Sequence, residues 1–336
     1  MPDPLIPDTL GEVGEVATLA RIFPRLPPAD AALVGPGDDA AVLRAPDGRY
    51  VVTTDTMVHG PDFRLAWSTP DELGWKAAAT NLSDVAAMGA VPTALVVALV
   101  APAATPVGDL ERLADGLREA CAALAPGCGV VGGDLSVSET LTIAVTAFGD
   151  LEGRAPVLRS GARPGDVVAI AGRLGLAATG LRLLFADGVD TAGAPDAVAA
   201  ARLRTTHPVA LAAQLAPSPP IALGPIAARG RATAMLDVSD GLAIDARRIA
   251  TASGVAIELD TTAVARVAGD GVDPRAALSG GEDHALLATF PADARLPDGF
   301  VPIGRAVEGA GLLVDGRAFD GRGGWDPYAD WDGAAG

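Results

Sequence analysis

The sequence has very few of the side chains that carry most metal, redox and nucleophilic chemistry. Of its 336 residues, only two are cysteine, three are histidine and one, Lys76, is lysine. Cys121 and Cys128 lie in no CxxC motif or Cys/His cluster, so we interpret both thiols as small packing residues and not as zinc ligands or a disulfide framework. The histidines show no spacing typical of metal ligands and no nucleophile partner, so we assign none of them a catalytic role.

Two familiar catalytic signatures are also missing. Lys76 does not lie in a GxxxxGK[ST] motif, so the sequence has no P-loop, and no GxSxG nucleophile elbow occurs. The formal net charge of -17 argues against a nucleic-acid surface, because such surfaces need a basic stripe. Nucleotides are not excluded by this argument, but a phosphate must be held by something other than a P-loop.

Long hydrophobic runs are absent as well. The longest one, around residues 94–104, is too short to span a bilayer, and the N-terminal residues lack the basic start and apolar core of a signal peptide. The composition, 49% hydrophobic and 20% charged, is typical of a folded, soluble protein. We therefore expect a cytoplasmic protein without a membrane association.

Hydrophobic patterning predicts two α/β halves, in which strands and helices alternate. A turn-rich stretch rich in glycine and proline follows Leu151, so we set the domain boundary there, giving domains 1–150 and 151–336. Strands are expected at 40–45, 50–58, 94–101, 129–134 and 141–150 in the first half, and at 167–172, 232–238, 256–260, 284–290 and 300–306 in the second. Helices in the second half are expected near 176–186, 196–215 and 241–252.

The best-defined helix follows residue 69. Thr69 can serve as its N-cap, Pro70 fits the first helical position, and Glu72 completes a capping box with Thr69. Gly89 marks its end.

A set of aspartates lies at or beside the apolar strand patterns, where unpartnered carboxylates would be costly to bury. Asp84 joins this set because it lies inside an alanine-rich helical pattern, three residues after Asn81 and on the same face. Singly, each aspartate is better explained by a helix cap or an Asx-turn. Together they indicate a shared cation. The other members are Asp38, Asp39, Asp55, Asp134, Asp237 and Asp240.

Oxygen ligands of this kind, with Thr53 and Thr54 nearby, suit Mg²⁺, which binds one or two carboxylates together with water and substrate phosphate. Four glycine-rich stretches, at 35–39, 130–134, 171–180 and 279–283, are either plain turns or places where backbone N–H groups approach an anion. Arg159 precedes a tight turn and is either a phosphate clamp or a surface arginine.

Seven segments, taken in order, resemble bacterial thiamine-monophosphate kinase, a family related to aminoimidazole ribonucleotide synthase. They are GPGDDAAVL, TTDTMVHGPDF, KAAATNLSDVAAMGA, VVGGDLS, RSGARPGDVVAIAG, LDVSDGLAIDA and LSGGEDHALL. The resemblance runs from about Gly11 to Trp325. It implies a two-domain α/β (α+β) fold of the aminoimidazole ribonucleotide synthase type, a homodimer joined through N-terminal domain strands, and ATP with several Mg²⁺ ions held between the domains.

The resemblance also implies roles for individual residues. The family's metal ligands correspond to Asp39, Thr53, Thr54, Asp55, Asp84, Asp134 and Asp237, with Asp240 binding a further ion. Nucleotide contacts correspond to Gly133, Asp134, Arg159 and Ser239, and substrate contacts to Asp62, Glu282 and Trp325. This chain has Asp62 where members commonly have histidine, Ala114 near the position of an aromatic residue that packs by adenine, and GWDPY at the usual GWDHF ending.

The implied reaction moves the γ-phosphoryl group of ATP to the phosphate of thiamine monophosphate. Because this acceptor is already deprotonated at neutral pH, we expect no side chain to act as a general base. Two other functions stay open at this point. One is another ATP-dependent activity of the same superfamily, and the other is a nucleotide-binding protein without catalysis.

Overall fold

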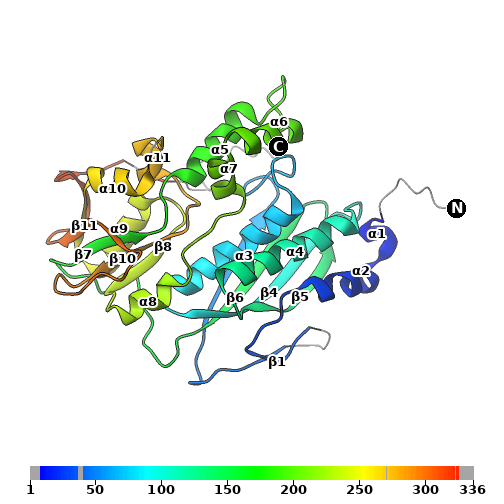
Figure 1. Ribbon diagram of the computed structural model, residues 1–336, viewed down its shortest axis with the longest axis horizontal. Helices are drawn as coiled ribbons and strands as arrows, with labels where there is room; N and C mark the ends of the chain where they lie inside the picture. The colour runs from blue at the N-terminus through cyan, green and yellow to red at the C-terminus, as the bar shows by residue number, and fades with distance from the viewer. Residues whose placement is uncertain (1–7, 37–40, 270, 322, 325–336) are drawn as a thin grey trace. The chain divides into compact units, whose positions relative to one another are not determined.

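The computed structural model describes residues 8–36, 41–269, 271–321, 323 and 324. These residues divide into two compact units (Figure 1). The first contains residues 8–82 and 92–150, and the second contains residues 83–91 and 151–324 in their described parts. The chain resumes in the second unit at Leu151, where the sequence predicts a boundary, but the short stretch 83–91 also belongs to the second unit.

The first unit contains one four-stranded sheet in the order β3-β6-β4-β5 and a separate two-stranded pair, β1-β2. β3 pairs antiparallel with β6, and β4 pairs parallel with β5. Its elements are α1 (Leu10–Val13), α2 (Glu15–Ile22), η1 (Phe23–Arg25), β1 (Ala32–Val34), β2 (Val42–Leu43), β3 (Val51–Val58), α3 (Pro70–Ala87), β4 (Val91–Ala101), α4 (Val107–Leu124), β5 (Gly129–Val137) and β6 (Thr142–Asp150). The strand expected at 40–45 is thus reduced to Val42–Leu43.

Helices α3 and α4 lie across one face of this sheet (Figure 1). Alternate residues of β6 on that face, Ile143, Val145 and Ala147, are fully buried, whereas the intervening residues stay partly exposed on the other face. This is the pattern of a sheet covered on one side. The capping box predicted for α3 is confirmed, since Thr69 Oγ1 accepts from Glu72 N at 3.2 Å and Glu72 Oε2 accepts from Thr69 N at 2.8 Å.

The two helices approach each other unusually closely through a pair of glycines. A Cβ added at Gly116 would lie 2.0 Å from the carbonyl oxygen of Asp71, and one at Gly74 would lie 2.0 Å from that of Leu113. Any side chain at either position would push the helices apart. Glycine at positions 74 and 116 is therefore what allows the two helix backbones to come into contact.

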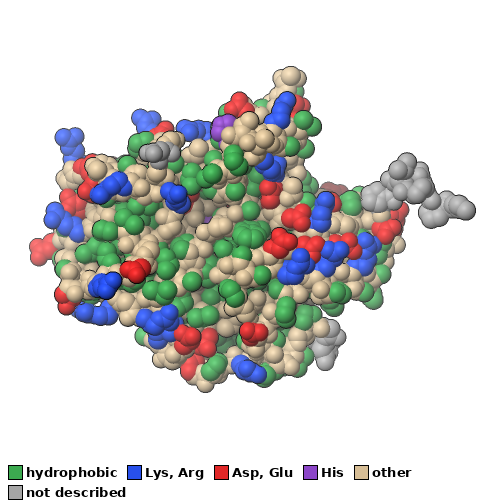
Figure 2. Space-filling model, viewed as in Figure 1, with side chains coloured by type: hydrophobic (Ala, Val, Ile, Leu, Met, Phe, Trp, Pro, Cys, Tyr) green, Lys and Arg blue, Asp and Glu red, His purple; other side chains and the backbone are tan. Residues whose placement is uncertain are grey.

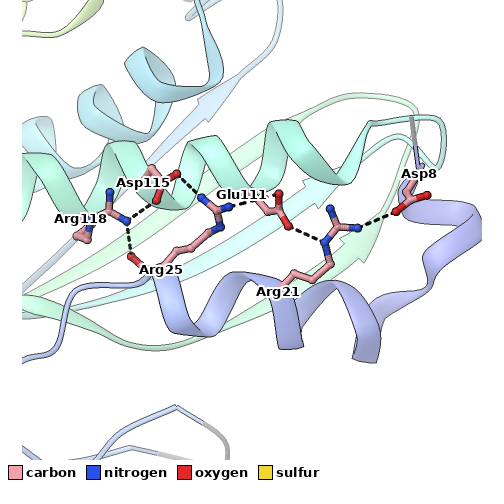
Figure 3. Close-up of polar contacts among 6 residues, drawn as sticks. All are labelled: Asp8, Arg21, Arg25, Glu111, Asp115 and Arg118. Atoms are coloured by element: carbon pink, nitrogen blue, oxygen red, sulfur yellow. Dashed lines mark hydrogen bonds and ion pairs between the residues drawn. The ribbon is translucent and has the colours of Figure 1, made fainter. Parts of the chain in front are cut away.

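A row of alternating charges joins α2 and η1 to α4 (Figure 3). Arg21 bonds Asp8 at 3.0 Å and Glu111 at 2.5 Å, and Arg25 bonds Glu111 at 3.6 Å and also Asp115. Figure 2 shows acidic and basic side chains alternating over the same helices. The row attaches two short elements that contribute few buried side chains of their own, so each pair adds modestly to a shared network.

The second unit contains a seven-stranded mixed sheet in the order β13-β12-β9-β11-β7-β10-β8. Strand β10, which lies between β7 and the edge strand β8, is buried along its whole length, and apolar clusters cover both sheet faces. The elements are β7 (Val167–Ala171), α5 (Leu176–Asp187), α6 (Ala197–Thr206), α7 (Pro208–Leu215), α8 (Leu223–Arg229), β8 (Ala234–Val238), α9 (Leu242–Ser253), β9 (Ala256–Leu259), α10 (Thr261–Ala268), α11 (Pro274–Ser279), β10 (Ala285–Phe290), β11 (Val301–Val307), β12 (Gly311–Val314) and β13 (Arg317–Ala318).

The sequence prediction of one helix over 196–215 is wrong. Helix α6 ends at Thr206 and α7 begins at Pro208, with His207 between them at φ -132°. Proline has no N–H to donate and its ring clashes with the carbonyl four residues earlier, so a helix cannot continue through it undisturbed. The two cysteines, in contrast, are buried and free, which confirms their interpretation as packing residues.

Candidate functional site

Edge strand β3 carries three of the residues to which the resemblance assigns metal binding. Asp55 pairs with the buried Val145 of β6, and Thr53 pairs with Ala147, so both face the helices. The pleat turns Thr54 to the opposite face, where its hydroxyl donates to the Val145 carbonyl at 2.9 Å. The hydroxyl of Thr54 therefore does not lie with the Asp55 carboxylate.

Asn81 of α3 fixes the backbone beside Asp55. Its side chain is 1% exposed, its Oδ1 accepts from Asp55 N at 3.1 Å, and its Nδ2 donates to Ala77 O at 2.9 Å. Both ends of the amide are thus engaged, which sets its orientation. Asp84 lies one helical turn further along α3. The three-residue spacing therefore places Asn81 and Asp84 on the same face of the helix, as the sequence predicts.

Gly133 and Asp134 lie within strand β5, which confirms the strand predicted at 129–134 and shows that the alternative of a plain turn at 130–134 is wrong. A Cβ on Gly133 would meet the Val97 carbonyl oxygen at 2.0 Å, so glycine is needed there for the approach of β4. Asp134 alternates with Leu135, which packs on the helix side beside Leu99. The Asp134 side chain is exposed and belongs to the other face of the sheet.

Asp55 and Asp134 are therefore not brought together within one chain. Their strands are the two edges of a four-stranded sheet, which separates them by three strand spacings, about 14 Å. They also point to opposite faces. A single ion cannot bridge such a distance, so these two carboxylates have no common ligand within one copy of this unit.

In the second unit, Asp237 is the penultimate residue of strand β8, and its side chain is paired with His284. The imidazole Nδ1 lies 3.1 Å from Asp237 Oδ2, and the two side chains are 6% and 7% exposed. The Ser83 hydroxyl, which precedes Asp84 at the end of α3, donates to the His284 carbonyl at 3.4 Å. Sequence reasoning missed this role of His284, because the pairing of β8 with β10 that joins the two residues is not visible in local patterns.

The turn after β8 carries Ser239 and Asp240. Sequence reasoning left open that Asp240 caps the following helix, and this is wrong: the N-cap of α9 is Gly241, without a side-chain bond. Instead Asp245, from the first turn of α9, accepts from the backbone N–H groups of Asp240 at 3.2 Å and Gly241 at 3.3 Å. The Asp240 carboxylate is bonded to Arg248 at 2.6 Å.

Burial raises the pKa of Asp245 to about 6, and the neighbouring carboxylates of Asp237 and Asp240 add to the rise, while Arg248 opposes it. Burial works against the charge of Arg248, but its bonds to Asp240 and Asp245 outweigh this and raise the pKa of the guanidinium. The turn is thus a small, strongly acidic region with one arginine inserted in it.

Glu282 and Asp283 precede β10 in a loop of unusual backbone geometry. Glu282 has φ 71°, and its N–H donates to the Ser239 carbonyl at 2.7 Å, which joins this loop to the β8 turn. Asp283 accepts from Gly175 and Ala177 at the start of α5, whose own N-cap residue has no side chain. Burial raises the pKa of Asp283 to about 6 despite those backbone bonds, which lower it.

Two further expected site residues, Arg159 and Asp62, lie at the surface. Arg159 is exposed, and its carbonyl accepts from the Ser253 hydroxyl at 3.2 Å. Asp62 is exposed and closes the turn after β3, where its Oδ2 accepts from Val58 N at 2.6 Å. Asp39 and Trp325 lie outside the described residues.

The donor chemistry of these residues suits Mg²⁺, since all expected ligands offer oxygen. Within the described part of the chain, no three side chains of the His, Cys, Asp and Glu types gather closely enough to hold a metal by themselves.

Comparison with known proteins places the chain in a family. Residues 37–151 match the family described as AIR synthase related protein, N-terminal domain. The thiamine-monophosphate kinase of Mycobacterium tuberculosis is 44% identical over 334 residues, covering 96% of this chain and 94% of the relative, and that of Corynebacterium glutamicum is 40% identical, covering 89% and 88%. A solved structure of AaThiL complexed with AMPPCP and TMP is 32% identical, covers 94% and 98%, and superposes with a TM-score of 0.69.

These matches confirm the expected fold class, a mixed α/β fold of the aminoimidazole ribonucleotide synthase type. The identity to the mycobacterial relative extends over nearly the whole of both chains. The chain belongs to the thiamine-monophosphate kinase family.

Proposed function

We propose that this chain transfers the γ-phosphoryl group of ATP to the phosphate of thiamine monophosphate, giving thiamine diphosphate and ADP. The observation that carries the proposal is the 44% identity to a thiamine-monophosphate kinase over 96% of the chain. The AaThiL complex with AMPPCP and TMP supports the same pair of ligands. Mg²⁺ is the proposed cofactor, on the ground of the oxygen-only ligand set.

The site residues take the proposed roles that the family resemblance implies. Metal binding falls to Asp39, Thr53, Thr54, Asp55, Asp84, Asp134, Asp237 and Asp240. Nucleotide binding falls to Gly133, Asp134, Arg159 and Ser239, and substrate binding to Asp62, Glu282 and Trp325. In support, Asn81 holds the backbone of Asp55, and His284 holds the carboxylate of Asp237.

The mechanism follows from the charge of the two reactants. Bound Mg²⁺ would neutralise charge on the phosphates and hold the attacking and leaving oxygens in line. The chain's own task is to hold the proposed ligands in place: Asn81 holds the backbone of Asp55, and His284 holds the carboxylate of Asp237. The acceptor phosphate needs no deprotonation at neutral pH, so no residue is assigned as a general base.

We also propose that the protein acts as a homodimer joined through the first-unit sheets. The resemblance implies this assembly, and the positions of Asp55 and Asp134 support it, because a second chain could supply at one edge the carboxylate that the first carries at the other. The sheet face away from α3 and α4 supports it too, since Val52 is 55% exposed there and Thr54 is also exposed.

In the part of the chain that the structure describes, no helix is long and apolar enough to cross a membrane. We keep the cytoplasm as the proposed location. The two buried, unpaired thiols are in keeping with a reducing compartment.

Product analysis tests the proposed reaction. Purified protein is incubated with ATP, Mg²⁺ and thiamine monophosphate, and thiamine diphosphate and ADP are quantified by chromatography. Equal amounts of the two products are expected. ADP without thiamine diphosphate would indicate a different activity of the superfamily, and neither product would indicate a nucleotide-binding protein without catalysis.

A further inference from the structure

Arg248 reaches back from the second turn of α9 to the start of the helix, where it joins two carboxylates. Its Nη1 donates to Asp245 Oδ1 at 2.6 Å, and its Nη2 donates to Asp240 Oδ2 at 2.6 Å. A guanidinium is planar and rigid, so donation from both ends fixes the two carboxylates relative to each other.

Asp245 extends this fixation to the backbone. Its side chain is 1% exposed, and its second oxygen accepts from the N–H groups of Asp240 and Gly241. One guanidinium thus controls both the Asp240 side chain and, through Asp245, the Asp240 backbone. A buried carboxylate that lost its arginine would keep its charge at a high cost or lose its orientation.

The turn is also held from its other side. The Ser239 carbonyl accepts from Glu282 N at 2.7 Å, and a Cβ on Gly281 would lie 2.6 Å from the same oxygen. Ser239 and Asp240 are therefore presented by a turn fixed between the Glu282 loop and Arg248. Partnering the buried Asp245 alone would need only one donor, whereas the second donor of Arg248 goes to Asp240, whose side chain is 30% exposed.

We propose that Arg248 is a positioning residue for the nucleotide: it fixes the turn that presents Ser239 and Asp240, and so sets the affinity for MgADP and MgATP. The identity of the ligand rests on the proposed function. The competing explanation is that Arg248 only stabilises the start of α9. Positioning changes nucleotide affinity in a folded protein, whereas mere stabilisation changes only the unfolding transition.

The experiment compares Arg248→Met and Arg248→Lys with wild type and with a matched control, Arg305→Met. Arg305 bonds Glu258 at 2.8 Å in the same unit, and its side chain is 68% exposed. MgADP binding is measured by calorimetry, and KM is measured separately for ATP and for thiamine monophosphate. Arg248→Met is expected to weaken MgADP binding about tenfold and to raise the KM for ATP similarly, as for other residues that orient a binding group.

The same change should leave the KM for thiamine monophosphate within about twofold, and Arg305→Met should match wild type in all three quantities. Arg248→Lys should restore part of the MgADP affinity, because one ammonium retains the charge but lacks the two-ended geometry. Hydrogen exchange provides a readout without substrate: the peptide containing the amides of Asp240 and Gly241 should exchange faster in Arg248→Met, and a peptide from β11 should not.

A folded Arg248→Met protein with wild-type MgADP affinity would overturn the proposal, even if its thermal midpoint were lower. If Arg248→Met does not fold, Arg248→Lys provides the test. A folded Arg248→Lys protein with wild-type MgADP affinity would also overturn the proposal. A wild-type protein that binds MgADP but forms no thiamine diphosphate would refute the proposed function and leave the comparison of Arg248 variants valid. Failure of wild type to bind MgADP would refute both.

Discussion

Two proposed metal ligands, Asp55 of β3 and Asp84 of α3, are not fully buried. The backbone N–H of Asp55 donates to Asn81, and the Asp55 side chain is exposed. Asp84 lies on the same helix face as Asn81 and is only partly buried. Neutralising either charge should therefore change chemistry far more than stability.

We predict that Asp55→Asn or Asp84→Asn lowers the rate of phosphoryl transfer at millimolar Mg²⁺ by about 100-fold or more, because each removes a proposed metal ligand. Initial rates of thiamine diphosphate formation measure the effect, and urea unfolding should stay within about 0.5 kcal/mol of wild type. Asp109→Asn, which removes only a surface pair with Arg112, serves as the control. Wild-type turnover in either site variant would refute the metal-ligand roles.

Asp283 makes the stability of the second unit depend on pH. Because its pKa is raised to about 6 in the folded chain, above its value in the unfolded chain, the folded state binds this proton more tightly. The contribution to stability is therefore full at pH values below the unfolded pKa and is lost as the pH rises through about 6.

We predict that Asp283→Asn removes this dependence of the free energy of unfolding on pH. Between pH 4.5 and pH 7 the wild-type free energy of unfolding should fall by about 2 kcal/mol more than that of the variant. Urea unfolding at the two pH values measures the difference, and Asp293→Asn, at an exposed position, should behave as wild type. Parallel pH profiles for wild type and Asp283→Asn would contradict the raised pKa.

At this scale the sequence predicts which residues carry carboxylates, but not what holds them. Strand alternation in the sequence could have shown that Thr54 faces away from Asp55, because the period of two was visible there. The pairing of His284 with Asp237 depends on two strands 47 residues apart, and no local pattern reveals it. The same holds for Asp245, which looks like an ordinary helix residue until its buried oxygens are traced to the turn.

Among the elements, predictions succeeded where a local chemical signal was strong. The start of α3 follows from Thr69, Pro70 and Glu72, and the central strands of both sheets follow from their apolar runs. Pro208 indicated the break between α6 and α7, but the apolar pattern around it favoured one continuous helix. The short strands β12 and β13 depend on packing against the rest of the sheet, so their own residues predict them weakly. Helices α10 and α11 do carry local start signals, the capping residues Asp260 and Asp273, which the sequence prediction did not use.

The glycine contact between α3 and α4 leads to a matched pair of variants. We predict that Gly116→Ala lowers the free energy of unfolding by about 3 kcal/mol or more, because its Cβ would lie 2.0 Å from a backbone oxygen that cannot move independently. Gly108→Ala, in the same helix, meets no atom within 4 Å and should stabilise by up to about 1 kcal/mol. Denaturant unfolding measures both, and equal effects would show that helix propensity and not the close contact decides.

For the whole molecule, the sequence predicted two α/β units but not the sheet order, and the sheet order is what bears on assembly. Asp55 and Asp134 lie on opposite edges only because β6 and β4 are inserted between β3 and β5. That insertion depends on long-range pairing, which no local pattern encodes.

We predict that Thr146→Arg converts the proposed dimer to a monomer and lowers activity with it. Thr146 lies on the sheet face away from the helices, where its hydroxyl contacts Thr54 at 3.2 Å, so an arginine there adds charge to the proposed interface without entering the core. Light scattering should give twice the 33.5 kDa chain mass for wild type and a single chain mass for the variant. Asp109→Arg on α4 is the control, and a Thr146→Arg dimer of full activity would speak against this interface.

The assignment of residues 83–91 to the second unit has a consequence for any attempt to divide this protein. The polypeptide passes from one unit to the other after Leu82, back after Val91 and across again after Asp150, so neither unit is a continuous length of chain. Truncation at residue 150 would leave the end of α3 without its packing partners. Ala87, for example, is buried in an apolar cluster of the second unit. The two units therefore cannot be expressed separately by cutting the gene once. A fragment that ends at residue 150 would contain the first unit together with residues 83–91 of the second.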